Sequence, residues 1–367
     1  MRLPLADSST RREHRMTPPV RLAPVLSALI VTALISSVFV SSIPAEAASP
    51  DDPSLLANVP TNRPDIHAFA APEPGFDAET ASALDLKKHG LPPRPSSTAH
   101  PQALSQWLEI VRHAKHAVTP RFAPRPARKA PQFTRGGSSS YNWSGAVAAQ
   151  PICFRFFCPV TPAPRIIGVE GSWTVPPVEG SAYVGTVSSW VGLDGYGNSQ
   201  VQQIGTDSTN TDFGFAMYEP WFELFPDSSQ AITSLSVAPG DQMFGMVQYS
   251  PGSNSIWFYL GDLATNQYTS FAVPAKYGSP GRSAEWIVER PTYNGTFDHP
   301  LPPFGTTTFS DMWFWNDASA SYPANASFPY TGTLLDMYDN SGTQLDHAAI
   351  KPDSANASIT TTWLNYQ

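Results

Sequence analysis

The chain has 367 residues, with 22 Lys and Arg against 30 Asp and Glu and a formal net charge of −8. The charge is divided unevenly: residues 1–135 carry 16 Lys and Arg and 11 Asp and Glu, whereas the rest carries 6 and 19, a net of −13. Such an acidic region repels phosphates, which excludes a nucleic-acid partner. The length accommodates one large β domain with additional processing segments.

The N-terminus has the order of an export signal. Basic residues precede an apolar run over residues 23–40, and the small-residue site Ala45-Glu46-Ala47 follows it. This order predicts a signal peptide over residues 1–47 and a secreted, extracellular protein. The alternative is a membrane anchor, because the run approaches spanning length. The small-residue end and the lack of a second such run favour export, so we expect no membrane association after the signal is removed.

Residues 48–136 are rich in proline and become basic toward their end. Residues 91–135 hold eight Lys and Arg and one acid, Glu109. A stripe of apolar residues after Pro101 predicts a helix: Leu104, Trp107, Leu108 and Val111. One interpretation is a disordered basic linker. The interpretation that we favour is a propeptide that docks on the acidic region and acts as its intramolecular inhibitor.

Residues 137–367 consist of short apolar runs separated by Gly, Pro, Asn and Ser, without a long 3.6-residue period. This pattern predicts an all-β sandwich or barrel. The only cysteines, Cys153 and Cys158, lie five residues apart. In an exported chain they favour a local disulfide, and a metal pair is disfavoured because no His or Cys ligand lies nearby. We therefore expect neither a metal nor another cofactor.

The strand-like stretch "SAEWIVERP" at residues 283–291 carries two glutamates. Alternation along a strand places Glu285, Ile287 and Glu289 on one face. The backbones of the two glutamates would be roughly 13 Å apart, whereas the carboxyl groups that hydrolyse glycosides are about 5–9.5 Å apart. The two glutamates are thus a poor glycosidase pair by themselves, and a partner such as Glu223 would have to come from another strand.

Several hydrolytic classes lack their signatures. After Gly136 only His299 and His347 remain, and the chain has no H-E-x-x-H, G-x-S-x-G or Asp-[Ser/Thr]-Gly motif. A Ser/His/Asp triad that uses one of these histidines stays formally open. The many aromatic residues leave a second class open, a non-catalytic, lectin-like module that binds carbohydrate.

From Tyr141 onward the sequence resembles the glutamic peptidases known as eqolisins, or family G1. Six motifs carry the resemblance, in order: "YNWSGAV" at 141–147, "SWTVPPV" at 172–178, "SWVGLDG" at 189–195, "VQQIGTD" at 201–207, "WFELFPD" at 221–227 and "AEWIVERP" at 284–291. The resemblance implies a sandwich of two antiparallel sheets. The sequence departs from the family pattern at Leu224, where an aromatic residue is usual. This departure leaves the substrate preference open.

The resemblance also implies site residues. Gln203 and Glu289 match the family's catalytic pair, Trp190 and Asp194 match its supporting tryptophan and aspartate, and Glu223 matches a further glutamate of the cleft. Glu289 would take a proton from the attacking water and return it to the leaving amine. Gln203 would hold that water and stabilise the oxyanion.

The assignment of Gln203 depends on strand register, because the adjacent Gln202 would face the other way. With this assignment, the resemblance implies an acid endopeptidase that pepstatin does not inhibit. We expect it to be made as a zymogen and to act as a monomer on protein or peptide substrates.

Overall fold

The structure is a computed structural model that describes residues 56–128, 138–151, 163–178, 184–292, 300–318, 320–324, 330–351 and 358–366. The chain divides into two compact units, Met1–Pro44 and Ala45–Gln367, and all described residues belong to the second. The predicted signal peptide and the predicted disulfide between Cys153 and Cys158 lie outside the described residues, so both stay predictions. The same holds for the propeptide boundary at residue 136.

One sheet, which we call the site sheet, lies in the second unit. Its strands follow the order β4 (Phe122–Pro124), β11 (Gln230–Ile232), β10 (Ala216–Phe225), β9 (Val201–Asn210), β8 (Gly185–Leu193), β15 (Ser283–Glu289), β6 (Trp143–Ala149) and β18 (Thr331–Tyr338). Every neighbouring pair in it is antiparallel.

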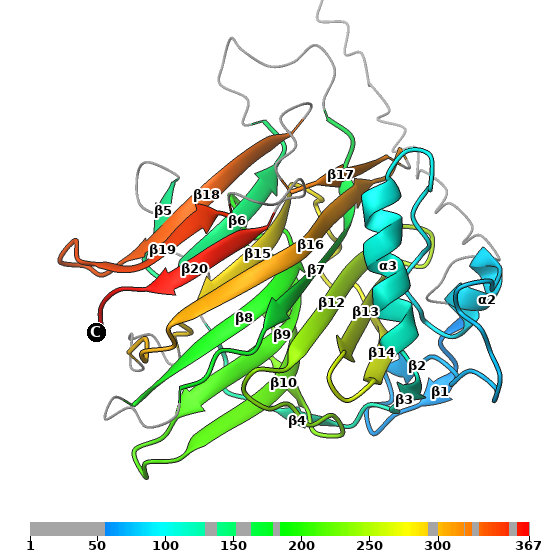
Figure 1. Cartoon of the computed structure of the whole chain (residues 1–367), viewed down its shortest axis with the longest axis horizontal. Helices are drawn as coiled ribbons and strands as arrows, with labels where there is room; N and C mark the ends of the chain where they lie inside the picture. The colour runs from blue at the N-terminus through cyan, green and yellow to red at the C-terminus, as the bar shows by residue number, and fades with distance from the viewer. Residues whose placement is uncertain are drawn as a thin grey trace, which may run out of the picture. The chain divides into compact units, whose positions relative to one another are not determined.

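The second sheet, the back sheet, runs in the order β1 (Val59–Pro60), β2 (His67–Ala68), β14 (Gln267–Pro274), β13 (Ser255–Asp262), β12 (Gln242–Ser250), β7 (Ile166–Thr174), β16 (Thr306–Asn316), β20 (Ile359–Trp363), β19 (Gln344–Ile350) and β18. Three short strands join it at its margins: β3 (His116–Ala117) on β14, β17 (Ser321–Pro323) on β16 and β5 (Ser139–Ser140) on β18. Because β18 pairs with β6 and with β19, it closes one side of the sandwich (Figure 1).

The hydrophobic core lies between the two sheets, and strand alternation decides which side chains enter it. On β15, Trp286 and Val288 belong to this core, while Glu285 and Glu289 face the other side of the site sheet. Trp286 Nε1 donates to the Glu170 backbone oxygen of β7 (2.8 Å), which links the two sheets. The predicted all-β, antiparallel sandwich is confirmed.

The other side of the sandwich is closed by Phe122 of β4. Its ring lies 5.2 Å from the Phe222 ring of the site sheet and 5.0 Å from the Phe271 ring of the back sheet, centroid to centroid. Phe122 therefore fills the gap between the sheets at the edge opposite β18.

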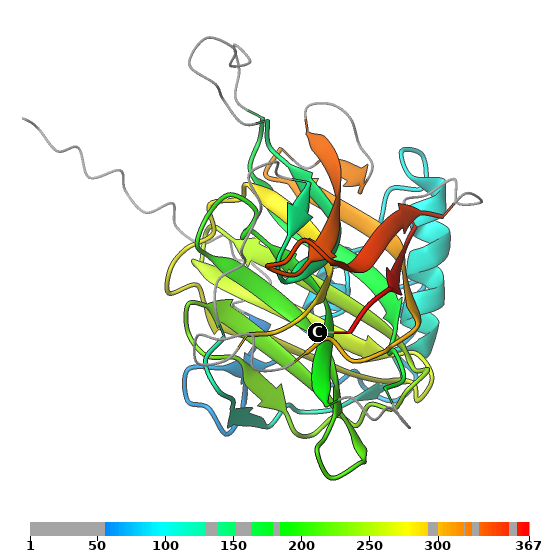
Figure 2. The same cartoon turned by 90° about the vertical axis from the view of Figure 1, so that its left-hand side faces the viewer.

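Both described helices, α2 (Ala83–Lys88) and α3 (Pro101–His113), lie in sequence between β2 and β3. The helix predicted after Pro101 is thus present, and it lies against the outer face of the back sheet (Figures 1 and 2). Its buried residues are Ala103, Trp107, Ile110 and Val111. Leu104 and Leu108 are only partly buried, because the face toward the sheet is rotated from the predicted stripe. Within the described part of the chain, no helix has the length and apolar character to span a membrane.

Candidate active site

The register of β15, β8, β9 and β10 aligns polar side chains on the face of the site sheet away from the core. One row contains Glu289, Ser188, Asp207 and Glu219. A second row, four residues along each strand, contains Glu285, Gly192, Gln203 and Glu223. Since residues separated by an even number share a face, all these positions lie on one side of the sheet.

Glu289 is buried at 3% exposure and is held by donors from two other strand regions. Its Oε2 accepts from Trp190 Nε1 (3.0 Å), and its Oε1 accepts from Asn142 Nδ2 (3.4 Å). Burial raises the pKa of Glu289, whereas Arg128 and the Trp190 donor act in the opposite direction. These contacts fix the carboxyl group while its pKa is shifted toward the range needed for proton transfer.

Gln203 faces the same side as Glu289 and is oriented by Glu223. Gln203 Nε2 donates to Glu223 Oε2 over 2.5 Å. Burial raises the pKa of Glu223 to about 7, with Arg128 opposing the shift and Glu289 adding to it. Gln203 Oε1 is buried and has no hydrogen-bond partner among the described residues. Its neighbour Gln202 takes the opposite face and reaches the Gly278 oxygen (3.5 Å), so the register brings Gln203 to the site.

Asp207 is a further buried carboxylate of this face. Its Oδ1 accepts from Ser188 Oγ (2.5 Å), and it forms ion pairs with Arg125 and Arg128. Burial alone would raise the pKa of Asp207, but the two arginines lower it to about 2. Sequence reasoning did not single out Asp207, although the alternation Gln203, Gly205, Asp207 could have identified it.

Two cations from the segment before the sandwich lie in this site. Arg128 Nη2 donates to both Asp207 oxygens (3.0 and 2.8 Å), and Arg128 Nη1 lies 3.5 Å from Glu289 Oε2. Its guanidinium carbon also lies 4.0 Å from the centroid of the Trp221 ring, a cation–π arrangement. Arg125 Nε lies 3.1 Å from Glu219 Oε2. The side chains of Arg125 and Arg128 therefore cover three carboxylates of the first row, Glu289, Asp207 and Glu219.

A sequence model of the Peptidase A4 family matches residues 141–361, more than half of the chain. The chain belongs to the Peptidase A4 family. This family comprises the eqolisins, or G1 glutamic peptidases, so the resemblance seen in the six motifs is confirmed. The protein is accordingly a member of a peptidase family.

The chain is also similar to solved structures of this family. A crystal structure of scytalido-glutamic peptidase with a peptide-based transition-state analogue is 20% identical, with a TM-score of 0.47, and the match covers 61% of this chain and 98% of that chain. A structure of SCP-B, a member of the eqolisin family, in complex with the tripeptide Ala-Ile-His is 18% identical, with a TM-score of 0.45 and the same coverage. No curated protein matches the chain.

The two other residues matched by the resemblance, Trp190 and Asp194, differ in whether they contact Glu289. Trp190 contacts Glu289 directly, and its ring packs edge-to-face on Trp143 with centroids 4.8 Å apart. Asp194 instead directly follows β8, with a φ of 66°. It accepts hydrogen bonds from Ser279 Oγ (2.9 Å), Gly281 N (3.0 Å), Arg282 N (2.8 Å) and Asn198 Nδ2 (3.0 Å). Asp194 therefore shapes the loop that leads into β15 and does not itself hydrogen-bond to Gln203 or Glu289.

Glu285, the other glutamate of "AEWIVE", lies in the row of Gln203 and is fully buried. Its Oε1 accepts from Tyr196 N (3.4 Å), and burial raises its pKa well above the ordinary value. Burial thus favours the neutral form of this carboxyl.

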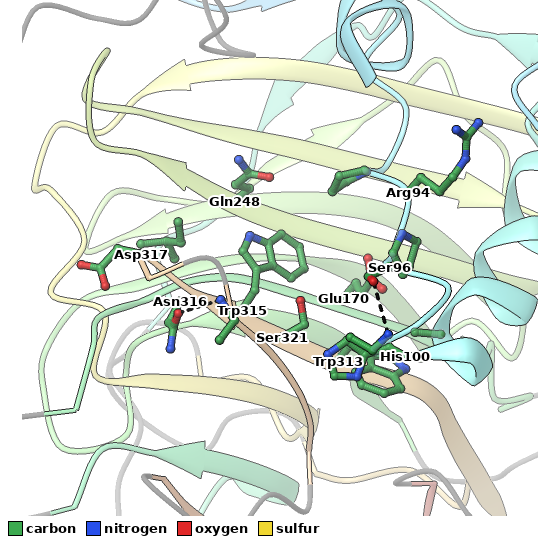
Figure 3. Close-up of a pocket in the computed structure, with 16 residues that line it drawn as sticks. Arg94, Ser96, His100, Glu170, Gln248, Trp313, Trp315, Asn316, Asp317 and Ser321 are labelled. Carbon is green, nitrogen blue, oxygen red and sulfur yellow. Dashed lines mark hydrogen bonds between the residues drawn. The ribbon is translucent and has the colours of Figure 1, made fainter. Parts of the chain in front are cut away.

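An open hollow of about 600 Å³ lies elsewhere, on the outer face of the back sheet (Figure 3). Its lining includes Glu170, Trp313 and Trp315 of the sheet and Arg94 and His100 of the preceding segment. Burial, followed by the charge of Asp311, raises the pKa of Glu170 to about 8. The hollow shares no residue with the two polar rows, which contain the two positions that the motif resemblance matched to the eqolisin catalytic pair.

Proposed function

We propose that this eqolisin is a secreted acid endopeptidase that activates water with Glu289 and Gln203. The observation that carries the proposal is the common face of the two side chains, each buried and each oriented by its own partner: Trp190 for Glu289 and Glu223 for Gln203. Peptides and proteins are the substrates that the family implies.

In the proposed reaction, Glu289 as carboxylate takes a proton from a water that attacks the scissile carbonyl carbon. The carbonyl oxygen becomes an oxyanion, and the Gln203 amide N–H donates to it. One such donor contributes about 3–4 kcal/mol to transition-state stabilisation. Glu289 then returns the proton to the leaving amine as the tetrahedral intermediate collapses, so no covalent bond to the protein forms.

Acid conditions suit these two groups. A glutamine amide does not titrate, so its donor function is independent of pH. Burial raises the pKa of Glu289, which makes its carboxylate a stronger base than that of an exposed glutamate. Protonated Glu223 also leaves Gln203 without a competing negative charge, since the pKa of Glu223 is about 7 because of burial.

We also propose that the chain is a zymogen inhibited by its own residues 48–136. Arg128 lies against Glu289 and Asp207, where a substrate would have to enter. The pKa of Asp207 is about 2 because the arginines overcome the effect of burial. Its ion pairs are therefore fully present above its ordinary pKa and are lost as the pH falls toward 2. Acid thus favours opening of the site.

The test is cleavage of a denatured protein at about pH 3–4, with pepstatin and a chelator present, by the wild type and by Glu289→Gln, each purified in the same mature form so that residues 125–128 no longer block the site. We expect activity in the wild type and none in the variant. Equal activity in both would remove Glu289 from catalysis. Absence of activity in a mature wild-type protein shown to be folded would contradict the peptidase proposal and favour the carbohydrate-binding module.

A further inference from the structure

Residues 56–124 cover an aromatic surface on the outer face of the back sheet. The covered side chains are each at most 1% exposed: Phe244, Met246, Trp257, Tyr259 and Tyr268. They form one buried cluster with Phe69, Leu86, Leu91, Trp107, Ile110 and Val111 of the segment. Apolar patches of this kind are rarely left open to water on a soluble protein.

The same segment pairs its backbone with the edge of β14. Phe69 N donates to the Ser270 oxygen (3.1 Å), His116 N to the Asn266 oxygen (3.0 Å) and Val118 N to the Tyr268 oxygen (2.8 Å). An uncovered edge of this length would present free backbone groups to other chains. The segment thus supplies both apolar and backbone partners for one edge and one face of the sandwich.

At its far end the segment is fixed by β4. Phe122 fills the gap between the two sheets, and Thr233 N donates to the Arg121 oxygen (2.8 Å). Asn62 Nδ2 and Oδ1 bond the Phe122 oxygen and nitrogen (both 2.8 Å), so β4 is tied to the earlier part of the segment. These contacts are apolar or between uncharged groups.

Residues 125–128 are held in a different way. Arg125 and Arg128 contact the carboxylates of Asp207, Glu219 and Glu289, and both face Trp221. Such ion pairs weaken when carboxylates protonate, whereas apolar burial does not depend on proton concentration. Acid therefore weakens the hold on residues 125–128 much more than the hold on residues 56–124.

We infer that residues 56–124 stay bound to the catalytic part after the chain is cut between the two, so that the active protein is a two-chain complex. Only the arginine-bearing end, residues 125–128, then leaves the site. The cut itself rests on the proposed zymogen, whereas the retention rests on the contacts of residues 56–124.

The titratable groups along the retained contact are compatible with acid. His113 Nδ1 lies 2.9 Å from Asn266 Oδ1 and its Nε2 lies 3.2 Å from Glu109 Oε1, so a protonated ring can donate from both nitrogens. The His100 ring packs on Trp313 with centroids 5.2 Å apart, beside the open hollow that also contains Glu170 (Figure 3). Glu170 gains no charge on acidification, because burial has raised its pKa to about 8. The remaining histidines of the two short strands, His67 and His116, are exposed.

The experiment uses the full chain with the substitution Glu289→Gln, so that the protein cannot digest itself. A recognition sequence for a specific processing protease is inserted between residues 129 and 137. After cutting at pH 7, the N-terminal piece is captured through a tag and the complex is passed over a sizing column at pH 7 and pH 4. We expect the two pieces to co-elute at both values. Separation at either pH would overturn the inference, whether or not the catalytic part stays folded.

Two variants distinguish an apolar anchor from an electrostatic one. Arg125→Ala with Arg128→Ala removes the cations, and we expect the pieces to co-elute as before. Trp107→Ala with Ile110→Ala removes buried contact from α3, and we expect at least tenfold weaker retention. Separation of the arginine variant alone would contradict the proposal. Because co-elution needs no activity, failure of the peptidase proposal would leave this result interpretable.

Discussion

Replacement of Arg128 by alanine in the full chain tests whether this residue blocks the site. Arg128 donates two hydrogen bonds to Asp207 and lies 3.5 Å from Glu289 Oε2. Removing one partner of a buried ion pair costs about 3–5 kcal/mol. Arg125 remains on Asp207 in the variant, so we expect a smaller loss of about 2–3 kcal/mol. At 1.4 kcal/mol per factor of ten, the open fraction would rise about 30- to 140-fold.

The assay is the initial rate of hydrolysis of a quenched fluorescent peptide at about pH 5, where Asp207 remains ionised because the arginines hold its pKa at about 2. A gel confirms that the chain is still uncut during the measurement. Arg128→Ala should exceed the wild-type rate by the factor above. The matched control is Arg121→Ala, because Arg121 is exposed and contacts the sandwich through its backbone.

A folded Arg128→Ala protein with a rate within twofold of the wild type would refute the reasoning. An equal increase in Arg121→Ala would also refute it, since the effect would then come from general loosening of the segment.

Three further predictions concern the site. Gln203→Ala should lower kcat about 10²- to 10³-fold with little change in KM, because the lost N–H acts on the oxyanion; a change confined to KM would contradict this role. Trp190→Phe removes the donor to Glu289 Oε2, so the pKa of Glu289 should rise. The acidic limb of the pH–rate profile should then move to higher pH. An unmoved limb would argue against Glu289 as the base. In the uncut Glu289→Gln chain, the fluorescence of Trp221 should change between about pH 4 and pH 2. The reason is that the arginines lower the pKa of Asp207 to about 2, so its ion pairs are lost only below its ordinary pKa. The variant Asp207→Asn should remove that transition.

The sandwich and the faces taken by Glu289 and Gln203 could be predicted from local alternation. The spacing of Glu285, Ile287 and Glu289 placed these residues on one face, and a period of two likewise separates Gln203 from Gln202. Asp207 follows from the same period, but its chemistry depends on Arg125 and Arg128, which come from distant sequence.

Other features depended on long-range contacts that no local pattern encodes. Eight cations precede the sandwich between residues 91 and 135, and only the pairing of β4 with β11 determines that Arg125 and Arg128 reach the site. Asp194 was matched to the site by motif, yet its hydrogen bonds go to a loop about 85 residues later in the chain. The outer aromatic face could not be predicted for the same reason, since its partners lie on residues 56–124, far from the sheet in sequence.

The two sides of the sandwich are closed by different means, and this difference affects how the domain would open. On one side β18 belongs to both sheets, so continuity of the chain holds them together. On the other side the contact between the two sheets depends on the side chain of Phe122. Phe122 belongs to the segment that would become a separate chain after cleavage. Amide hydrogen exchange in β11 and β14 would therefore follow the residence time of that segment, whereas exchange in β18 would follow global unfolding.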